Sequence, residues 1–238
     1  MAWDARLPIG LGYNRSMKLV LCSEGFKTDN TVQACVELCN KPQDQISVAV
    51  INEAYAAEEG DKYWVVDNLN SVAQNFTGGL DIVDLLALPL DTVKQRIMQC
   101  DVIFTIGGQV DYLMSVFNKT GFAKLLPELL ETKVYVGSSA GSMVLGKRLS
   151  AEAYDTMYGQ TGTYGITKYM ELVDVAIMPH MDSEHFPHRQ ETLLQAAGDH
   201  PGTIYGLRDD SALVVNGLQR SLIGSPAIVI QDGQVVAS

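Results

Sequence analysis

A short run of small residues carries the clearest catalytic signal in this chain. Residues 137–141 read Gly-Ser-Ser-Ala-Gly, which fits the G-x-S-x-G pattern of a nucleophile elbow, a serine at the apex of a tight strand-to-helix turn. Residues 134–136, Val-Tyr-Val, favour a buried strand, and the apolar residues that follow the run have helical spacing. Glycines on both sides leave room for such a turn. Ser139 is therefore the candidate nucleophile, aimed at a carbonyl carbon.

A serine hydroxyl is a weak nucleophile at neutral pH, so Ser139 needs a neighbouring base. The chain has four histidines. His180 follows directly on a predicted strand, which we expect to end at the same sheet edge as the elbow, and it is the preferred base. His185 and His188 lie further along a polar loop, where a solvated or substrate-contacting role is expected. His200 lies in an Asp-His-Pro-Gly turn and is interpreted as a surface residue.

A carboxylate would fix the tautomer of the imidazole and stabilise the imidazolium that forms during attack. Asp209 is the preferred group, because it ends the strand that follows the helix after His180. Asp210 is its immediate competitor. Asp182, close to His180 in sequence, is a third alternative.

An oxyanion hole needs two N–H donors near the nucleophile. The N–H of Ala140, directly after Ser139, is one candidate. Gly108 is the other, because the Gly-Gly pair 107–108 ends a buried strand at residues 101–106, at the sheet edge where open α/β sheets bind ligands. A plain strand-to-helix turn is the alternative interpretation of this pair.

The elements that must position these residues alternate between strand and helix. Continuous apolar runs predict strands at residues 18–23, 46–51, 80–86, 101–106, 173–178 and 203–207. Helical patterns are predicted at residues 28–40, 58–75, 90–100, 111–118, 121–131 and 190–197. This alternation indicates an α/β fold, a doubly wound, mostly parallel sheet between helical layers.

Two segments lie outside this alternation. Residues 149–171, rich in Tyr, Gly, Thr and Met, are expected to form a long loop over the active-site edge. The last strands, at residues 212–215, 222–230 and 235–236, are separated by Asn-Gly and Asp-Gly turn signals and are expected to form a β-meander. Residues 1–16 have no periodic pattern and are interpreted as an N-terminal extension that need not be native. Residues 17–238 are expected to form a single domain.

The amino-acid composition limits the classes of binding partner and cofactor that we expect. A net charge of −11 without any Lys/Arg cluster disfavours nucleic acid and anionic membranes. Cys22, Cys35, Cys39 and Cys100 lack C-x-x-C spacing and lie in predicted strands and helices, so they are interpreted as buried thiols of a reducing cytosol. None of them is near the elbow in sequence, which disfavours a cysteine enzyme. No zinc-ligand spacing is present, and we expect neither a metal nor another cofactor.

The order Ser, His, Asp differs from the Ser, Asp, His order of lipase-type hydrolases. The chain instead resembles the aspartyl dipeptidase (peptidase E) and cyanophycinase family of serine peptidases. The resemblance runs from about residue 17 to the C-terminus and rests on four motifs in order: residues 107–109 (Gly-Gly-Gln), 136–141 (Val-Gly-Ser-Ser-Ala-Gly), 179–184 (Pro-His-Met-Asp-Ser-Glu) and 206–212 (Gly-Leu-Arg-Asp-Asp-Ser-Ala).

This resemblance implies a class I glutamine amidotransferase-like α/β fold, with Ser139 as nucleophile and His180 as base. Asp209 stands where the family usually has Glu, and Gln109 stands where it has Asn. The family includes dipeptidases that cleave after an N-terminal Asp and cyanophycinases that release β-aspartyl-arginine from a polymer.

The chain length favours the small-peptide activity, with the polymer hydrolase and a catalytically silent binding relative as alternatives. The expected compartment is the cytoplasm, in line with the cysteines. Gln109, Asp182 and Arg189 are the candidate substrate-binding residues, and Arg189 would hold a substrate carboxylate. A small peptide is the expected partner, and a homodimer stays open.

Overall fold

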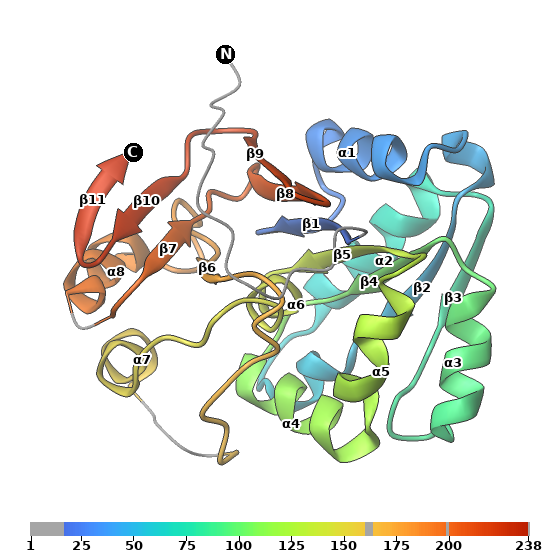
Figure 1. Cartoon of the computed structure of the whole chain (residues 1–238), viewed down its shortest axis with the longest axis horizontal. Helices are drawn as coiled ribbons and strands as arrows, with labels where there is room; N and C mark the ends of the chain where they lie inside the picture. The colour runs from blue at the N-terminus through green and yellow to red at the C-terminus, as the bar shows by residue number, and fades with distance from the viewer. Residues whose placement is uncertain (1–16, 160–163, 199, 238) are drawn as a thin grey trace.

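Strands and helices alternate along most of the chain in the computed structural model, which describes residues 17–159, 164–198 and 200–237 (Figure 1). Within these residues a seven-stranded sheet has the order β3-β2-β4-β5-β1-β8-β9. Its strands are β1 (Lys18–Cys22), β2 (Ser47–Ile51), β3 (Gly79–Ile82), β4 (Val102–Thr105), β5 (Val134–Ser138), β8 (Ala212–Asn216) and β9 (Gln219–Ile223). The first five in this order run parallel, and β8 and β9 are antiparallel to their neighbours.

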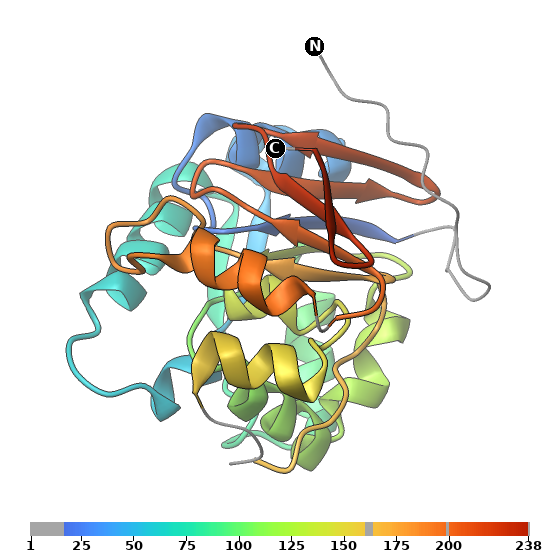
Figure 2. The same cartoon turned by 90° about the vertical axis from the view of Figure 1, so that its left-hand side faces the viewer.

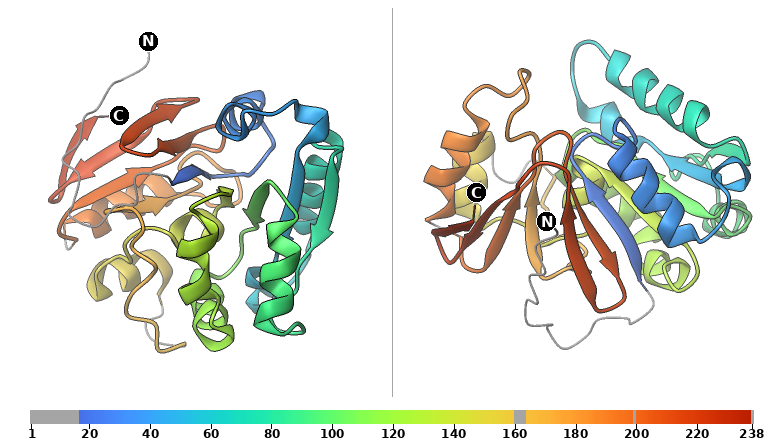
Figure 3. Two further views of the ribbon diagram at one scale, coloured as in Figure 1. Left: turned by 45° about the vertical axis from the view of Figure 1, so that its right-hand side comes forward. Right: turned by 90° about the horizontal axis from the view of Figure 1, so that it is seen from above.

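A second, four-stranded sheet has the order β11-β10-β7-β6 in the described part of the chain. It is formed by β6 (Val175–Met178), β7 (Thr203–Gly206), β10 (Ile228–Gln231) and β11 (Gln234–Ala237). Figure 3 shows from above that this sheet lies next to the β8–β9 end of the larger one. Strands β6 and β7 pair in parallel, and β10 and β11 complete the sheet in antiparallel fashion.

Helices cover the sheets on both sides. They are α1 (Asp29–Cys39), α2 (Tyr63–Asn75), α3 (Leu90–Met98), α4 (Val110–Thr120), α5 (Phe122–Leu129), α6 (Ala140–Met143), α7 (Ala151–Tyr158) and α8 (Arg189–Ala197), with 3-10 turns η1 (Gln43–Gln45) and η2 (Glu53–Ala57). Figure 2 shows α7 and α8 side by side, and α8 contacts β7 of the smaller sheet.

The core divides along the faces of the larger sheet, because successive strand side chains point to opposite sides. Val20 and Cys22 of β1 pack with α1 and α2 in one apolar cluster. Leu19 and Leu21 belong to the other cluster, which contains α3, α4 and α5 and continues into the smaller sheet. Both faces are buried, which explains the continuous apolar runs of these strands.

The predicted α/β class, with a mostly parallel central sheet, flanking helices and C-terminal antiparallel strands, is confirmed. Three details differ from the sequence predictions. The expected loop at 149–171 contains α7, which Ser150 caps by accepting a hydrogen bond from the N–H of Ala153. The predicted strand 222–230 is two strands, split at Gly224, whose φ is 82°. The C-terminal strands therefore form two hairpins in different sheets instead of one meander.

No helix among residues 17–159, 164–198 and 200–237 is long and apolar enough to cross a membrane.

Candidate active site

Ser139 lies at the apex of the turn between β5 and α6. Its backbone angles, φ 51° and ψ −113°, belong to a region that residues with a side chain seldom adopt. The flanking glycines have no room for a methyl group. A Cβ on Gly141 would lie 2.1 Å from the carbonyl oxygen of Thr105 on β4, and one on Gly137 would lie 2.5 Å from the carbonyl carbon of Gly141. The turn is therefore tight in the way that a nucleophile elbow requires.

Hydrogen bonds fix the elbow to the neighbouring strand. The N–H of Ser139 donates to the carbonyl of Cys22 at the end of β1, over 3.1 Å. The hydroxyl of Ser142 lies 2.7 Å from the same carbonyl and 2.6 Å from that of Gly137. The helix after the elbow is a single turn, shorter than the apolar pattern predicts. Rigidity at Ser139 thus comes from these contacts with β1 and β4.

Cys22 lies beside the elbow in space, although it is far from it in sequence. Its Sγ is 2.8 Å from the carbonyl oxygen of Gly137. Burial raises the pKa of this thiol to about 12. The thiol therefore stays protonated at neutral pH and is a structural neighbour of the nucleophile.

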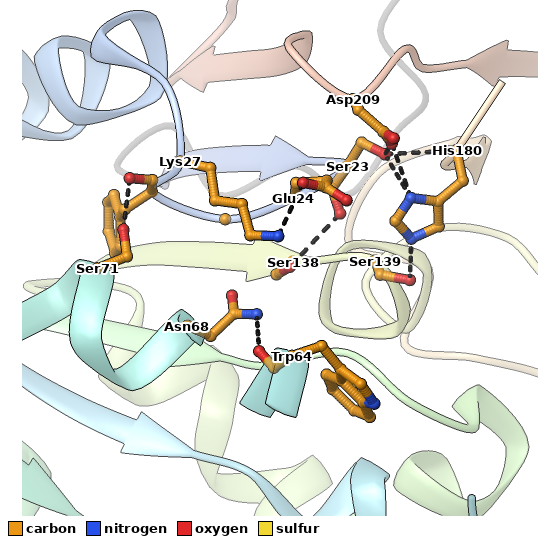
Figure 4. Close-up of polar contacts among 12 residues, drawn as sticks. Ser23, Glu24, Lys27, Trp64, Asn68, Ser71, Ser138, Ser139, His180 and Asp209 are labelled. Carbon is orange, nitrogen blue, oxygen red and sulfur yellow. Dashed lines mark hydrogen bonds and ion pairs between the residues drawn. The ribbon is translucent and has the colours of Figure 1, made fainter. Parts of the chain in front are cut away.

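His180 faces Ser139 from the end of β6 (Figure 4). Its Nε2 lies 3.0 Å from the Oγ of Ser139, and its Nδ1 lies 2.7 Å from Oδ1 of Asp209. The backbone of His180 has φ 68°, and its ring stacks on that of Phe186 at 4.8 Å between centroids. Strand β6 belongs to the smaller sheet, so the expectation that His180 shares a sheet edge with the elbow is wrong. The two residues meet across the junction of the two sheets.

Of the three carboxylates considered as partners of His180, Asp209 is the one bonded to the imidazole. The side chain of Asp210 points elsewhere, and its Oδ2 accepts hydrogen bonds from the N–H and hydroxyl of Ser225. Asp182 accepts a hydrogen bond from the backbone N–H of Asp209, over 2.9 Å. Asp182 therefore supports the loop that carries Asp209.

Ser23, which the sequence analysis did not select, joins both residues. Its hydroxyl donates to Oδ1 of Asp209 over 2.8 Å and accepts a hydrogen bond from the backbone N–H of His180 over 2.9 Å. Its side chain is fully buried. The only available signal was its position directly after β1, at the carboxyl end of a strand next to β5, where ligand-binding residues gather in parallel sheets.

The charge state of Asp209 follows from these contacts. Burial by itself would raise the pKa of the carboxyl group, but the hydrogen bond and charge of His180 and the hydrogen bond from Ser23 outweigh it, so the pKa is lowered. Asp209 is therefore ionised over the whole neutral range and can stabilise an imidazolium.

A lowered pKa stabilises the folded state only while the carboxyl group is ionised. This contribution is complete above the unfolded pKa of about 4 and is lost as the pH falls through the lower folded value. We expect the difference in unfolding free energy between wild type and Asp209→Asn to be larger at pH 6 than at pH 3, measured by urea unfolding. A difference that grows on acidification would contradict this account.

The predicted oxyanion-hole donors lie on both sides of the nucleophile. A Cβ on Gly107 would lie 2.9 Å from the Cβ of Ser139, so the loop 107–108 passes directly beside the elbow. Within the described chain, neither the N–H of Gly108 nor that of Ala140 has a protein acceptor. Both groups are therefore free to donate to a substrate oxygen, and their role in catalysis stays a prediction.

Gly108 provides a test of this arrangement. Its φ is 130°, and a Cβ would lie 2.4 Å from the carbonyl carbon of Ala54 in η2. We expect Gly108→Ala to displace the loop and to lower kcat by about 10²-fold or more, the usual effect of losing one oxyanion donor. Gly159→Ala is the control, because Gly159 also has a positive φ but open space around it. Equal kcat values for the two variants would argue against an oxyanion role for this loop.

The predicted substrate-binding residues Gln109 and Arg189 are engaged within the protein. The side chain of Gln109 caps α4 by accepting a hydrogen bond from the N–H of Tyr112. The guanidinium of Arg189 donates to the hydroxyl of Tyr158 over 3.0 Å and lies 5.1 Å from the ring centroid of Phe186. Neither residue lines the cavity at Ser139.

The remaining histidines differ in their surroundings. His185 lines the cavity. His188 is exposed and pairs with Glu191 over 3.1 Å. His200 is buried, which corrects its interpretation as a surface residue, and its Nδ1 accepts a hydrogen bond from the N–H of Ser150 at the start of α7. Burial lowers the pKa of His200, followed by the charge of Lys147, so it is neutral at physiological pH.

A cavity of 610 Å³ opens in front of Ser139 and His180. Gly107 and Gly108 border it beside the nucleophile, and Phe186 borders it beside the imidazole. The opposite walls come from the loop after β1 and from the segment that leads into α2. This volume accommodates a small peptide.

One group of potential metal ligands occurs among the described residues. Donor atoms of Glu24, His180 and Asp209 lie within 4.8 Å of one another. The imidazole already uses Nδ1 toward Asp209 and Nε2 toward Ser139. A metal ion here would take an atom from the Ser139–His180–Asp209 chain, so this donor set fits the hydrogen-bonded arrangement better than a metal centre. The absence of a metal requirement stays a prediction.

Comparison with known proteins places the chain among peptidases. The model of peptidase family S51 matches residues 19–223. An uncharacterized peptidase of Pasteurella multocida is 25% identical over 149 residues, which cover 62% of this chain and 71% of that protein. An uncharacterized peptidase of Listeria monocytogenes is 27% identical over 140 residues, covering 57% of this chain and 66% of the relative.

Solved structures agree in fold. A peptidase E-type protein from L. monocytogenes EGD-e has a TM-score of 0.69 at 21% identity, covering 88% of this chain and 98% of its own. A peptidase from an acI-B1 Actinobacterium has a TM-score of 0.65 at 16% identity, with 95% of each chain covered. The resemblance to the peptidase E family that the four motifs indicated is thereby confirmed.

Proposed function

This chain belongs to peptidase family S51, and from that premise we propose that it is a serine-type peptidase that cleaves small peptides through an acyl-enzyme on Ser139. The observation that carries the proposal is the continuous chain of contacts from nucleophile to carboxylate. Ser139 Oγ lies 3.0 Å from His180 Nε2, and His180 Nδ1 lies 2.7 Å from Asp209 Oδ1. Both distances suit direct proton transfer and orientation.

In the proposed reaction, His180 takes the proton of Ser139 as the hydroxyl attacks the peptide carbonyl. The N–H groups of Gly108 and Ala140 stabilise the oxyanion of the tetrahedral intermediate. His180 then gives its proton to the leaving amine, which breaks the peptide bond and leaves an ester on Ser139. Attack by a water molecule, with His180 again as base, releases the acid and restores the enzyme.

Two finer features complete the proposal: the substrate class, which the sequence resemblance implies, and the compartment. The substrate class would be dipeptides and small peptides with an N-terminal aspartate, with β-aspartyl-arginine as the alternative. The compartment would be the cytoplasm, which the four free cysteines support. Small peptides are the proposed partners, and a homodimer stays open.

A fluorophosphonate probe tests the chemistry independently of substrate. We expect the probe to label the wild-type protein at Ser139, located by peptide mapping, and to label His180→Ala far more slowly, because the base is missing. The same preparation is then incubated with α- and β-aspartyl dipeptides. Absence of labelling in correctly folded wild type would reject the serine mechanism and favour a catalytically silent relative.

A further inference from the structure

We infer that the cavity at Ser139 selects peptides with a cationic side chain, lysine or arginine, through the wall that α2 and the segment before it form. This inference rests on the proposed serine-peptidase function, and it replaces the preference for aspartate that the sequence resemblance implies with a preference for basic peptides. We use the name α2 wall for six residues that line the cavity on this side: Glu58, Glu59, Asp61, Trp64, Asp67 and Asn68.

The charges that border the cavity are strongly unbalanced. Four carboxylates belong to the α2 wall, and Glu24 lies on the opposite side. The one lysine or arginine among the lining residues, Lys27, has its Nζ 3.0 Å from Oε2 of Glu24. Its charge is therefore already paired within the protein. A cavity lined in this way attracts cations and repels a substrate carboxylate.

The side chain of Asn68 supports cation binding independently of the charges. Its side chain is only 6% exposed, and its Nδ2 donates to the carbonyl of Trp64 over 2.8 Å. Its Oδ1 is buried without a hydrogen-bond partner and packs against Gly25, where a Cβ would lie only 2.7 Å away. An unpaired buried acceptor is costly, and the residue that carries it borders the cavity, although the oxygen itself is covered. A rotation of the side chain toward the cavity would let the N–H groups of an ammonium or guanidinium satisfy this oxygen.

The wall also presents an aromatic face. Asp67 and Asn68 lie three and four positions after Trp64 on α2, so each of them is a neighbour of Trp64 on the helix surface. Figure 4 shows the indole of Trp64 projecting from α2 below Ser139, with Asn68 beside it. A tryptophan ring attracts cations through its π face. Carboxylates, an amide oxygen and an indole together are the chemistry that recognises a lysine or arginine side chain.

The cation expected to hold a substrate carboxylate lies elsewhere. Arg189 does not border the cavity, and its guanidinium is held by the hydroxyl and ring of Tyr158, 5.0 Å from the ring centroid. An aspartate side chain in the cavity would therefore meet Lys27 in competition with Glu24 and be repelled by the α2 wall. The lining favours a basic peptide over an acidic one.

The test is a panel of dipeptides with lysine, arginine, leucine or aspartate at the first or the second position. We expect wild type to have its highest kcat/KM on a lysine or arginine peptide, above leucine and well above aspartate. The double variant Glu58→Gln, Asp67→Asn should lose about 10-fold on the basic peptides, since each exposed carboxylate contributes a few-fold, and change little on leucine peptides. Asp44→Asn, Glu131→Gln is the matched control, with the same charge change at exposed positions outside the cavity.

Probe labelling at Ser139 tests the serine-peptidase function separately from the cation-selective wall. If the wild type is labelled but prefers aspartate peptides, or if both double variants behave alike, the cation-selective wall is wrong and the serine peptidase stands. If the folded protein is neither labelled nor active on any peptide, the proposed function fails, and the inference fails with it. A loss confined to basic peptides in the α2-wall variant supports the inference.

Discussion

Replacement of Ser139 by alanine is expected to lower kcat/KM for peptide hydrolysis by about 10⁴-fold or more. The acyl-enzyme needs this hydroxyl. The hydroxyl of Ser23 also lies close to the imidazole, 3.2 Å from Nδ1, but it is fully buried and already donates to Asp209, so it cannot replace Ser139. The fold should be unchanged, because within the described residues the Oγ of Ser139 makes a single hydrogen bond, to His180, and the elbow is held by backbone hydrogen bonds and by Ser142. The measurement is initial-rate hydrolysis of the best peptide of the panel, with circular dichroism of both proteins.

Ser138→Ala is the matched control for this variant. Ser138 is the neighbouring serine and also borders the cavity, but its hydroxyl lies 3.4 Å from the carbonyl of Ser23 and takes no part in the contact chain to Asp209. We expect its kcat/KM to stay within a few-fold of wild type. If Ser138→Ala were inactive and Ser139→Ala active, the elbow assignment would be wrong.

The largest effect on stability is expected for Asp111→Ala. Asp111 on α4 is 2% exposed, and its Oδ2 lies 3.0 Å from the guanidinium of Arg148. Its Oδ1 accepts a hydrogen bond from the hydroxyl of Tyr169 over 2.7 Å. Removing the carboxylate leaves a buried guanidinium uncompensated, which costs about 3 to 5 kcal/mol of unfolding free energy. Urea unfolding followed by tryptophan fluorescence measures the loss.

Two comparisons make this prediction specific. The exposed pair of Lys94 and Glu128 has a similar contact distance, 2.6 Å, with side chains 42% and 57% exposed. We expect Glu128→Ala to cost less than about 1 kcal/mol. Adding Arg148→Met to Asp111→Ala should recover part of the stability, because the uncompensated charge is removed. An equal loss for Asp111→Ala and Glu128→Ala would refute the uncompensated-charge explanation.

The parts of the site that the sequence predicted are those determined by local pattern. The elbow is recognisable because a strand, a Gly-flanked serine and a helical turn are contiguous in residues 134–143. His180 and Asp209 could be selected because each follows directly on a short apolar run that ends a strand. The alternatives Asp210 and Asp182 stayed open beside Asp209, since neighbouring residues at a strand end point in directions that only the three-dimensional fold determines.

The features that escaped prediction depend on packing between distant segments. In the sequence, Ser23 is an ordinary polar residue after a strand. Its role becomes apparent only in the fold, where β6 and β7 place His180 and Asp209 next to it. His200 reads as a turn residue, and its burial comes from contact with the start of α7. The division of the strands into two sheets was also hidden, because each strand of the smaller sheet has the same apolar pattern as those of the larger one. The negative charge of the cavity could not be predicted from the sequence either, because it arises from the position of α2 opposite the loop after β1.

The division into two sheets has a consequence for how the molecule can work. The hydroxyl of residue 139 is carried by the larger sheet, whereas the imidazole follows β6 of the smaller one and the carboxylate lies in the loop between β7 and β8, which joins the two sheets. A slight rotation of one sheet relative to the other would separate the reacting atoms while every strand and helix stays intact. The catalytic rate should therefore depend strongly on the relative orientation of the two sheets. Changes in the packing between them can alter the rate without altering any reactive side chain.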